Sequence, residues 1–479
     1  MTATYPSGQK SFSRRTDAVD DILATDVNQA YDEIEALEAE LGLNPADKTG
    51  GTAGAYATVK ARLDKAHRAA TFVVAASDAS ADSRQFADYL CDGTADNVDI
   101  NAAITAAGAG KVELSEGTFA CTSRINLDGK SPLSLIGSGI PSFSQNKAPT
   151  LLTFTLGSAG NCIDVDNTAS ATTGPCHIAD IGIEGVANCT NGIALGTAAH
   201  LCNFDRILIN GTFSNAGYTS HSNSSQNRLY HVYTQHVTPY GFELGGGGNI
   251  YHGIQAMNDS VVASSKGIWI KDLRSSTLIA PFVYKAELAY DVGSSGGGND
   301  ITIVGPKVEA STNGYKFNGN VHNVSIFGGR VDATTHATQA AVLFTQCDNI
   351  HVFGLYVEAN TSQKSFYADS SGTNILCVGC NALGTTPYSK HASASMTVRD
   401  DVGFNPQGAL GPPAVPASTV AYTNAYMVDC QVYITGGTVT VIAIGSFTTG
   451  LTSGMFIVPA GQTITITYSS VPTWTWYGL

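Results

Sequence analysis

Gly241-Phe242-Glu243-Leu244 is one copy of a four-residue pattern that recurs through the middle of the chain. Each copy places a small residue before a bulky apolar residue, then any residue, then an apolar one. The other copies are Gly192-Ile193-Ala194-Leu195, Gly267-Ile268-Trp269-Ile270, Ala289-Tyr290-Asp291-Val292, Gly314-Tyr315-Lys316-Phe317, Ala341-Val342-Leu343-Phe344 and Ser365-Phe366-Tyr367-Ala368. With the weaker copy Gly217-Tyr218 included, the intervals from Gly192 are 25, 24, 26, 22, 25, 27 and 24. Such a period indicates stacked repeats that bury their apolar faces only against their neighbours.

Within each copy the apolar residues alternate, so we expect a β-strand. The later periods contain a second strand, as in Val324-Ser325-Ile326-Phe327-Gly328 and Ile350-His351-Val352-Phe353-Gly354. Several short strands without a helix in each repeat exclude the helical solenoids, and the dense leucine pattern of leucine-rich repeats is absent. The sequence therefore predicts a mainly β protein, a right-handed parallel β-helix with one coil per repeat and about 4.8 Å between coils.

The N-terminal segment, residues 1–72, has a different pattern. Six apolar residues are spaced 4, 3, 4, 3 and 4 apart: Leu23, Val27, Ala30, Ile34, Leu37 and Leu41. This heptad seam predicts a short helical coiled coil, with a second helix over 56–69 after a glycine-rich break. A small helical hairpin packed on itself is the alternative.

Residues 73–400 are assigned to the β-helix. Near its start the sequence predicts a helix over 97–107, with apolar residues at Ile100, Ala103, Ile104 and Ala107. A helix there would cover the open end of the stacked coils, which would otherwise expose apolar side chains and unpaired backbone groups.

The C-terminal residues form the third part of the chain. Residues 401–416 are assigned to a linker rich in proline and glycine, and 417–479 to a small antiparallel β-sandwich, because Val439–Ile444 and Gln462–Tyr468 alternate sharply. About 60 residues lie near the lower limit for an independently stable domain, so we expect it to gain stability from identical neighbours.

Composition limits the function. The 479 residues include 25 basic and 39 acidic side chains, a net charge of −14, which argues against binding nucleic acid or an anionic membrane through a basic patch. No apolar run is long enough to span a bilayer, so we expect no membrane insertion. The ten scattered cysteines indicate reduced, packed thiols made in a cytosol, and no metal or cofactor is expected.

A ladder of charged residues follows the later repeats: Lys285-Ala286-Glu287, Lys307-Val308-Glu309, Arg330-Val331-Asp332 and Tyr356-Val357-Glu358. The acids Glu287, Glu309, Asp332 and Glu358 lie 22, 23 and 26 positions apart, so they should stack on neighbouring coils. Carboxyl groups about 5 Å apart suit a retaining glycosidase. The favoured interpretation is a structural ladder in which neighbouring basic residues neutralise the acids, and the catalytic role is the alternative.

A second candidate is a polar aromatic stretch that contains Tyr230, His231, Tyr233, His236 and Tyr240. Such rings could bind a glycan by stacking on sugars while imidazole groups bond their hydroxyls. The favoured alternative is that these residues face the core of the β-helix.

The residues around Asp92-Gly93-Thr94-Ala95-Asp96-Asn97, the following alanine-rich helix and Leu114-Ser115-Glu116-Gly117-Thr118-Phe119 resemble the start of the pectate-lyase-like (pectin lyase-like) β-helix superfamily. The likeness is greatest to its bacteriophage tailspike and tail-fibre members, although a proline of their strand motif is missing here. The N-terminal pattern resembles adaptor segments of phage structural proteins, and the C-terminal segment resembles modules that help fibre trimers assemble and sometimes bind receptor.

This resemblance implies a virion protein of the phage tail, made in the host cytoplasm. It would be a homotrimer that joins other virion proteins through its N-terminal segment and host cell-surface polysaccharide through its β-helix. Two other functions stay open: a depolymerase, either a glycoside hydrolase or a lyase, that cleaves this polysaccharide, and a non-binding structural spike or decoration of head or tail. The same fold serves all three, and the enzyme is not favoured.

Overall fold

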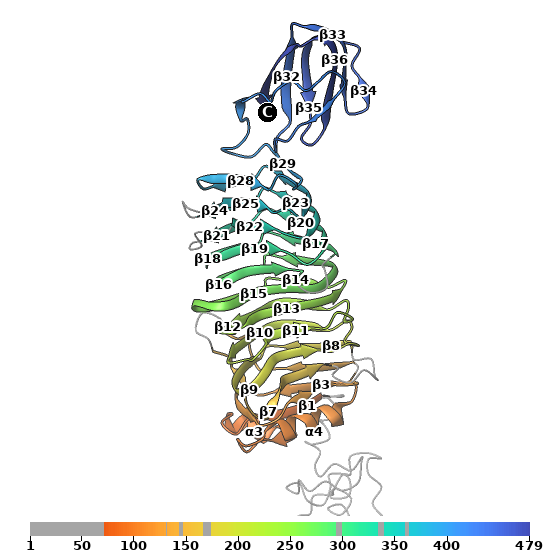
Figure 1. Cartoon of the computed structure of the whole chain (residues 1–479). Coiled ribbons are helices and arrows are strands. Elements are labelled where there is room, and N and C mark those ends of the chain that lie inside the picture. The colour runs from red at the N-terminus through yellow and green to blue at the C-terminus, as the bar shows by residue number, and fades with distance from the viewer. Residues whose placement is uncertain are drawn as a thin grey trace, which may run out of the picture. The chain divides into compact units, whose positions relative to one another are not determined.

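The computed structural model describes residues 71–130, 132–142, 147–165, 174–293, 299–333, 340–359 and 364–479. The helical predictions for residues 1–70 lie outside the described residues. From residue 71 to residue 399 the chain winds into a solenoid of about ten turns whose strands pair in parallel, coil upon coil (Figure 1). The prediction of a mainly β fold built on a parallel β-helix is confirmed.

Each coil has three sides, and strands that pair from coil to coil form three faces, which we call A, B and C. Six long strands bend around corners and contribute to more than one face. They are β7 (Thr150–Val165), β9 (Gly182–Leu195), β10 (Asn203–Gly211), β12 (Arg228–Gln235), β15 (Gln255–Ile279) and β16 (Phe282–Val292).

The remaining strands of the solenoid belong to single faces. Face A contains β1 (Thr71–Ala75), β2 (Tyr89–Leu90), β3 (Lys111–Leu114), β6 (Leu133–Ile136), β8 (Cys176–Ala179), β14 (Ile250–His252), β17 (Asn299–Val304), β20 (Val321–Phe327), β23 (Cys347–Phe353), β26 (Gly372–Val378) and β29 (Met396–Arg399). Face B contains β4 (Gly117–Cys121), β18 (Lys307–Ser311), β21 (Arg330–Ala333), β24 (Tyr356–Ala359) and β27 (Asn381–Leu383). Face C contains β5 (Ile125–Asn126), β11 (Ala216–Ser220), β13 (Tyr240–Gly247), β19 (Asn313–Phe317), β22 (Ala340–Phe344), β25 (Lys364–Ala368) and β28 (Thr386–Lys390).

The four-residue pattern marks face C. Its bulky residue points inward, and successive copies pair in register: Tyr218 on Ile193 and Phe242, Ile268 on Phe242 and Tyr290, Tyr315 on Tyr290 and Val342, and Phe366 on Val342 and Tyr388. Stacked rings fill the upper core, with centroids 4.4 Å apart for Tyr290 and Tyr315 and 4.9 Å apart for Phe366 and Tyr388. The repeat is therefore the packing unit of the solenoid.

The small first residue of the pattern is required by a close approach of the backbone. A Cβ at Gly267 would lie 2.3 Å from a methyl carbon of Val283 on face B and 2.9 Å from the carbonyl oxygen of Ala289 on the next coil. Real Cβ atoms do not approach other atoms so closely, so glycine at position 267 lets faces B and C meet at this corner.

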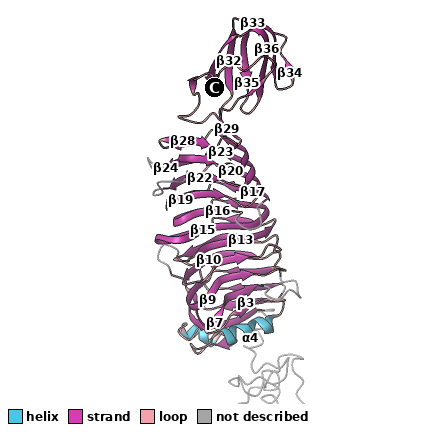
Figure 2. Ribbon diagram, in the orientation of Figure 1, coloured by secondary structure: helices cyan, strands magenta, loops and turns pink. Residues whose placement is uncertain are grey.

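Helices lie at the N-terminal end of the solenoid (Figure 2). Helix α3 (Ala81–Gln85) is short, and α4 (Asn97–Ala107) packs against β3, β4 and β5 and buries Ile100 and Ile104. The carboxylate of Asp96 accepts a hydrogen bond from the backbone amide of Ala120 at 2.8 Å. The helix occupies the range that the sequence predicts for it.

Two four-stranded antiparallel sheets form the C-terminal module. One has the order β30 (Gly408–Leu410), β37 (Thr473–Gly478), β32 (Cys430–Thr435), β35 (Gly454–Val458), and the other β31 (Ala421–Thr423), β36 (Thr463–Ser470), β33 (Thr438–Ile444), β34 (Phe447–Thr448). Trp474 and Trp476 belong to its buried core. Strand β30, which pairs with β37, lies within the range 401–416 that the sequence analysis assigns to a linker.

Candidate functional site

The third residue of each four-residue copy points outward, and these residues form one column on face C. In order along the stack the column contains Asp164, Ala194, Thr219, Glu243, Trp269, Asp291, Lys316, Leu343, Tyr367 and Ser389. Three of its members are carboxylates that are almost fully buried, with 1 % of Asp164, 7 % of Glu243 and 3 % of Asp291 exposed. Buried charges of this kind need partners, so their surroundings show what the site can do.

A cleft opens where the side chains of this column are small. Ala194 and Thr219 occupy two successive coils between Asp164 and Glu243, and the space above them is a cavity of about 360 Å³. Its lining is Asn161, Asp164, Ala194, Leu195, Gly196, Thr219, Ser220, His221, Ser222, Glu243, Lys271 and Asp272. Hydroxyl, carboxylate, imidazole and ammonium groups thus meet in a space of the size that ligand pockets have.

Glu243 is held at one end of the cleft by three donors. Nζ of Lys271 lies 2.8 Å from Oε1, Nδ2 of Asn215 donates to Oε2 at 2.7 Å, and the hydroxyl of Thr219 donates to Oε2 at 3.3 Å. The three donors contact both carboxylate oxygens and so fix the orientation of the carboxylate. This carboxylate is therefore an oriented hydrogen-bond acceptor.

Asp164 lies at the other end of the cleft. Nη1 of Arg124 lies 2.9 Å from its Oδ2, and the amide of Asn161 also donates to it. Burial raises the pKa of Asp164 in spite of these two groups. Nδ2 of Asn191 donates to Asn161 at 2.8 Å and Nδ2 of Asn215 donates to Asn191 at 2.9 Å, so a chain of amide hydrogen bonds connects Asn161, which lines the cleft, to the donor of Glu243.

The distance between the two acids decides what the cleft can do. They lie three coil steps of about 4.8 Å apart, or about 14 Å along the stack. A glycosidase needs its two carboxyl groups about 5 to 9.5 Å apart. Asp164 and Glu243 cannot act as such a pair, and the arrangement suits binding of a polar ligand that spans several coils.

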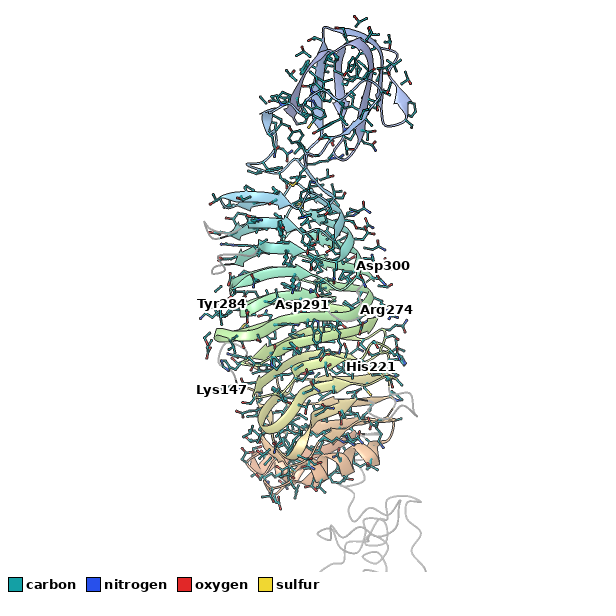
Figure 3. All side chains as sticks on the ribbon, viewed as in Figure 1. Lys147, His221, Arg274, Tyr284, Asp291 and Asp300 are labelled. Atoms are coloured by element: carbon teal, nitrogen blue, oxygen red, sulfur yellow. The ribbon has the colours of Figure 1, made fainter. Side chains whose placement is uncertain are left out.

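Aromatic and charged groups continue the column beyond Glu243. The rings of Tyr240 and Trp269 lie 4.7 Å apart, and Nζ of Lys266 lies 4.5 Å from the centroid of Trp269 and 2.5 Å from Oδ2 of Asp291. Figure 3 labels His221, which lines the cleft, and Asp291, which lies further along the stack. Of the predicted glycan-binding residues, Tyr240 lies on the same strand as Glu243, three positions before it, and does not line the cleft.

The other predicted glycan-binding residues are divided among the faces. Tyr230 and His231 lie at face A, where their ring centroids are 6.0 Å and 5.5 Å from the ring centroid of His252. Tyr233 lies on face B and accepts a hydrogen bond from Gln255 at 3.0 Å. Nε2 of His236 lies 2.9 Å from Oδ2 of Asp259. The structure thus does not bring the five residues together.

The predicted acid ladder forms on face B in part, because a shift of register between Val308 and Ser311 separates Glu309 from the paired acids Asp332 and Glu358. Val308, Val331 and Val357 point inward and pair in register, and Asp332 pairs with Glu358. Glu287 does not join this column, because Tyr284 pairs with Glu309 and Glu287 accepts a backbone hydrogen bond from Ser264 instead. Two shifts of register between β15 and β16 displace the Lys285-Ala286-Glu287 segment.

Basic groups accompany the acids of this ladder. Nζ of Lys307 lies 2.7 Å from Glu309, and Nη2 of Arg330 lies 2.9 Å from Oε2 of Glu358 but 3.9 Å from Asp332. Burial and the negative charges of Glu358 and Glu309 raise the pKa of Asp332, and Arg330 opposes this shift. Asp332 is thus the ladder acid that gains least from its cation.

Other ligand classes find little support within the described ranges. No cluster of three or more histidine, cysteine or acidic side chains suited to a metal ion occurs among the described residues. All ten cysteines are buried as free thiols. In the part of the chain that the structure describes, no helix is long and apolar enough to cross a bilayer.

Comparison with known proteins identifies no family for this chain. No protein-family model matches the chain, and no curated protein matches it. Several solved structures are similar. A mutant tailspike protein of E. coli bacteriophage HK620, in complex with a pentasaccharide, is 11 % identical with a TM-score of 0.49, covering 95 % of this chain and 100 % of that one.

Two further solved structures show the range of the likeness. ORF18 of Geobacillus virus E2 is 15 % identical, with a TM-score of 0.36 over 78 % of this chain and 72 % of that one. The A-module of a mannuronan C-5 epimerase from Azotobacter vinelandii is 14 % identical, with a TM-score of 0.37 over 65 % and 91 %. At such identities the likeness concerns the fold alone, and proteins of different function share it.

Proposed function

We propose that this chain is a bacteriophage virion protein, a tail fibre or tailspike that attaches the particle to its host by binding a surface glycan in the face C cleft. The observation that supports this most is the cleft itself, a polar hollow between two buried, oriented carboxylates. Sugar hydroxyls both donate and accept hydrogen bonds, and the cleft offers acceptors at Asp164 and Glu243 and donors at Lys271 and the serines.

The ligand class follows from charge and length. The acids at the two ends of the cleft are each paired with a cation, and the whole chain carries a net charge of −14. A neutral or amino-bearing glycan of a few sugar units therefore fits better than a polyanion. One tailspike of similar fold was solved in complex with a pentasaccharide, and the ligand proposed here is of the same chemical class.

The proposal includes assembly. The N-terminal segment, residues 1–72, would join other virion proteins of the tail, and three identical chains would form the fibre. The C-terminal module would keep them together, since Asp429 is the one charged side chain from Gly403 to Leu479 and large apolar side chains such as Phe447, 81 % exposed, lie on its surface. Three cleft sites on one particle would give avidity that a single weak site lacks.

A filled cleft tests the binding function. Ala194→Trp places a large ring in the hollow, and the fold should accept it because Trp269 and Tyr367 occupy the same column on other coils. Ser389→Trp, in the same column at the far end of face C, is the matched control. Binding to an array of bacterial lipopolysaccharides and capsular polysaccharides should fall at least about tenfold for the first variant and stay unchanged for the second. Equal binding by both variants, or no binding by the wild-type chain, would refute the proposal.

Cleavage of the glycan on face B is the second candidate, and the raised pKa of Asp332 favours it. Asp332 and Glu358 pair on adjacent coils, a step of about 5 Å, which matches the carboxyl separation of a retaining glycosidase. Protonated Asp332 would give its proton to the glycosidic oxygen while the carboxylate of Glu358, 2.9 Å from Arg330, bonds to the anomeric carbon as the C–O bond breaks. Water would then release the sugar and return the proton to Asp332.

Release of reducing ends from host polysaccharide measures this second activity. Asp332→Asn and Glu358→Gln should each abolish it while binding at the cleft persists. Asp300→Asn, an exposed acid on face A, is the control and should cleave at the wild-type rate. If the wild-type chain binds polysaccharide but releases no reducing ends, attachment without cleavage is the function.

A further inference from the structure

A second hollow lies on face C, on later coils than the cleft. It has a volume of about 310 Å³ and is lined by residues of β15, β16, β19 and β22, which belong to four successive coils. None of its lining residues lines the cleft. Lys316 in the hollow lies three coil steps of about 4.8 Å beyond Glu243, or about 14 Å along the stack. The two cavities are thus separate sites on one face.

The floor of the second hollow is apolar. Leu288 and Leu343, both half-buried, line it together with Ala340. Leu343 is the outward third residue of its copy, and Leu288 occupies the position that Lys266 and Asn313 hold on the neighbouring coils. Leucines where other coils have polar side chains give the hollow an apolar patch that packing of the core does not require.

The charges at the second hollow balance one another. Two lysines, Lys266 and Lys316, and two acids, Asp291 and Glu287, lie in or beside it. Nζ of Lys266 lies 2.5 Å from Oδ2 of Asp291, and Glu287 accepts a hydrogen bond from the backbone amide of Ser264. Because both acids already have partners, a neutral group fits the hollow better than a cation.

Two polar groups of the hollow are available to a ligand. Among the described residues Lys316 has no ion-pair partner. Oδ1 of Asn313 is buried with no hydrogen-bond partner in the described part of the chain, while its Nδ2 donates to the carbonyl oxygen of Glu287 at 3.3 Å. The terminal torsion of asparagine is soft, so a small rotation turns Oδ1 toward a ligand. A ligand that donates to this oxygen removes the cost of a buried acceptor without a partner.

An acetamido group matches the three features of the hollow. Its methyl group packs on the leucine floor, its carbonyl oxygen accepts from Nζ of Lys316, and its N–H donates to Oδ1 of Asn313. A hydroxyl group has no apolar part to cover the floor. An ionised carboxylate has no hydrogen to donate to Asn313.

We propose that the second hollow is a specificity site that recognises the acetamido group of a 2-acetamido sugar. This rests on the proposed function, because it assigns the hollow to the glycan that the cleft binds, and it adds a chemical group that this glycan carries. A glycan that extends about 14 Å along face C reaches from Glu243 to Lys316. The cleft then binds hydroxyl groups, and the hollow separates glycans that carry the acetamido group from those that lack it.

Saturation-transfer difference NMR of the full chain with single sugars tests the hollow separately from the cleft. The probes are N-acetyl-D-glucosamine, N-acetyl-D-galactosamine and N-acetyl-D-mannosamine, each compared with its N-formyl form and its parent hexose. The acetyl methyl of at least one probe should receive the strongest saturation. The N-formyl form of that probe lacks the methyl group and should bind about fourfold more weakly. The parent hexose lacks the amide as well and should bind at least about tenfold more weakly.

Variants of face C locate the site. Leu343→Trp fills the hollow and should remove the methyl signal, whereas the control Ser389→Trp, in the same column beyond the hollow, should keep it. Trp269 and Tyr367 show that this column accepts large rings. Lys316→Met should weaken binding of the acetamido sugar about tenfold, and Lys316→Arg, which keeps a cationic donor, should recover most of it. Thermal unfolding checks that each variant folds.

The outcomes separate this proposal from glycan binding in the cleft. Three results would overturn it: no binding of any acetamido sugar, equal binding of the acetamido sugar and its parent hexose, or a methyl signal that persists in Leu343→Trp. If one of these is found while Ala194→Trp abolishes binding to polysaccharide, the cleft keeps its function and the assignment of the hollow alone fails. If the wild-type chain also binds no polysaccharide, both proposals fail.

Discussion

Lys271 and Glu243 form an ion pair across neighbouring coils of face C, with Nζ 2.8 Å from Oε1. Glu243 belongs to the repeat pattern, whereas Lys271 follows the pattern of the next coil by one residue. The side chain of Glu243 is 9 % exposed and that of Lys271 is 38 % exposed, so the pair lies at the edge of the cleft with the carboxylate inside. The pair links the stability of the solenoid to the geometry of the proposed glycan site.

Lys271→Met should destabilise the protein, because it leaves the buried carboxylate without its cation. The cost should be about 1–2 kcal/mol, below the full cost of breaking a buried pair, since Lys271 is partly exposed and Asn215 still donates to Glu243. Urea unfolding measures this value. Adding Glu243→Gln to the variant should recover most of the loss, and a double variant no more stable than the single one would show that the pair is not the cause.

The same ion pair has a defined pH range. The hydrogen bond to Glu243 raises the pKa of Lys271, so the pair contributes fully below about pH 10.5 and loses its contribution as the pH rises further. The difference in unfolding free energy between wild type and Lys271→Met should therefore be constant from pH 6 to 9 within about 0.5 kcal/mol. A difference that disappears already at pH 8 would contradict this assignment.

The contribution of Glu116 to stability should have the opposite pH dependence to that of the Lys271–Glu243 pair. Hydrogen bonds from the backbone amide and the hydroxyl groups around Ser80 and Ser83 lower the pKa of Glu116 to about 2. A lowered pKa adds stability above pH 4.5, which is lost as the pH falls toward 2. Glu116→Gln should thus cost up to about 1 kcal/mol at pH 7, limited by solvent screening, and almost nothing at pH 2. Thermal unfolding of wild type and Glu116→Gln at pH 7 and at pH 2 measures this cost.

Gly314→Ala tests why the repeat begins with a small residue. The new Cβ would lie 2.4 Å from a methyl carbon of Val331 and 2.7 Å from the carbonyl oxygen of Ala341, so we expect a loss of about 1–3 kcal/mol. Val331→Ala in the same chain should remove the first contact and recover part of the loss. Gly157→Ala, where nothing lies within 4 Å of the new Cβ, should have no such effect.

Removal of one complete coil should leave a folded, shorter solenoid. Deletion of residues 315–341 joins Gly314 to Val342 and keeps the register, because Tyr315 and Val342 occupy the same position on adjacent coils. Deletion of residues 315–328, about half a coil, should instead misalign all later strands. The first variant should keep the β-sheet circular dichroism spectrum of the wild-type chain and melt cooperatively. The second variant should aggregate. Equal disruption by both deletions would contradict a stack of equivalent coils.

The register of face C could be predicted from the sequence because each coil repeats one local packing problem. Every turn needs a small residue at a corner and a bulky residue after it. The spacing alone therefore predicts that Tyr290, Tyr315 and Phe366 lie in stacked positions. The same logic failed for Glu287. The chain between Met257 and Lys266 contains two register shifts, and a spacing of 22 residues does not place Glu287 over Glu309.

The cleft could not be predicted from the pattern, because it depends on the position that the pattern leaves free. Ala194, Thr219 and Glu243 differ in every property, and only their register shows that two small side chains lie between two acids. The signal in the sequence that could have indicated the cleft was the change in size and charge of the third residue from one copy to the next. Tyr230 and Tyr233 were grouped by closeness in sequence, yet a corner of the coil separates them onto faces A and B.

Hydrogen–deuterium exchange of the full chain, with and without saturating host polysaccharide, tests glycan binding in the cleft most directly. We predict slower exchange in residues 191–196, 216–222 and 240–245, which line the cleft on three successive coils. Protection confined to residues 307–311, 330–333 and 356–359 on face B, or no protection anywhere in the solenoid, would contradict the account.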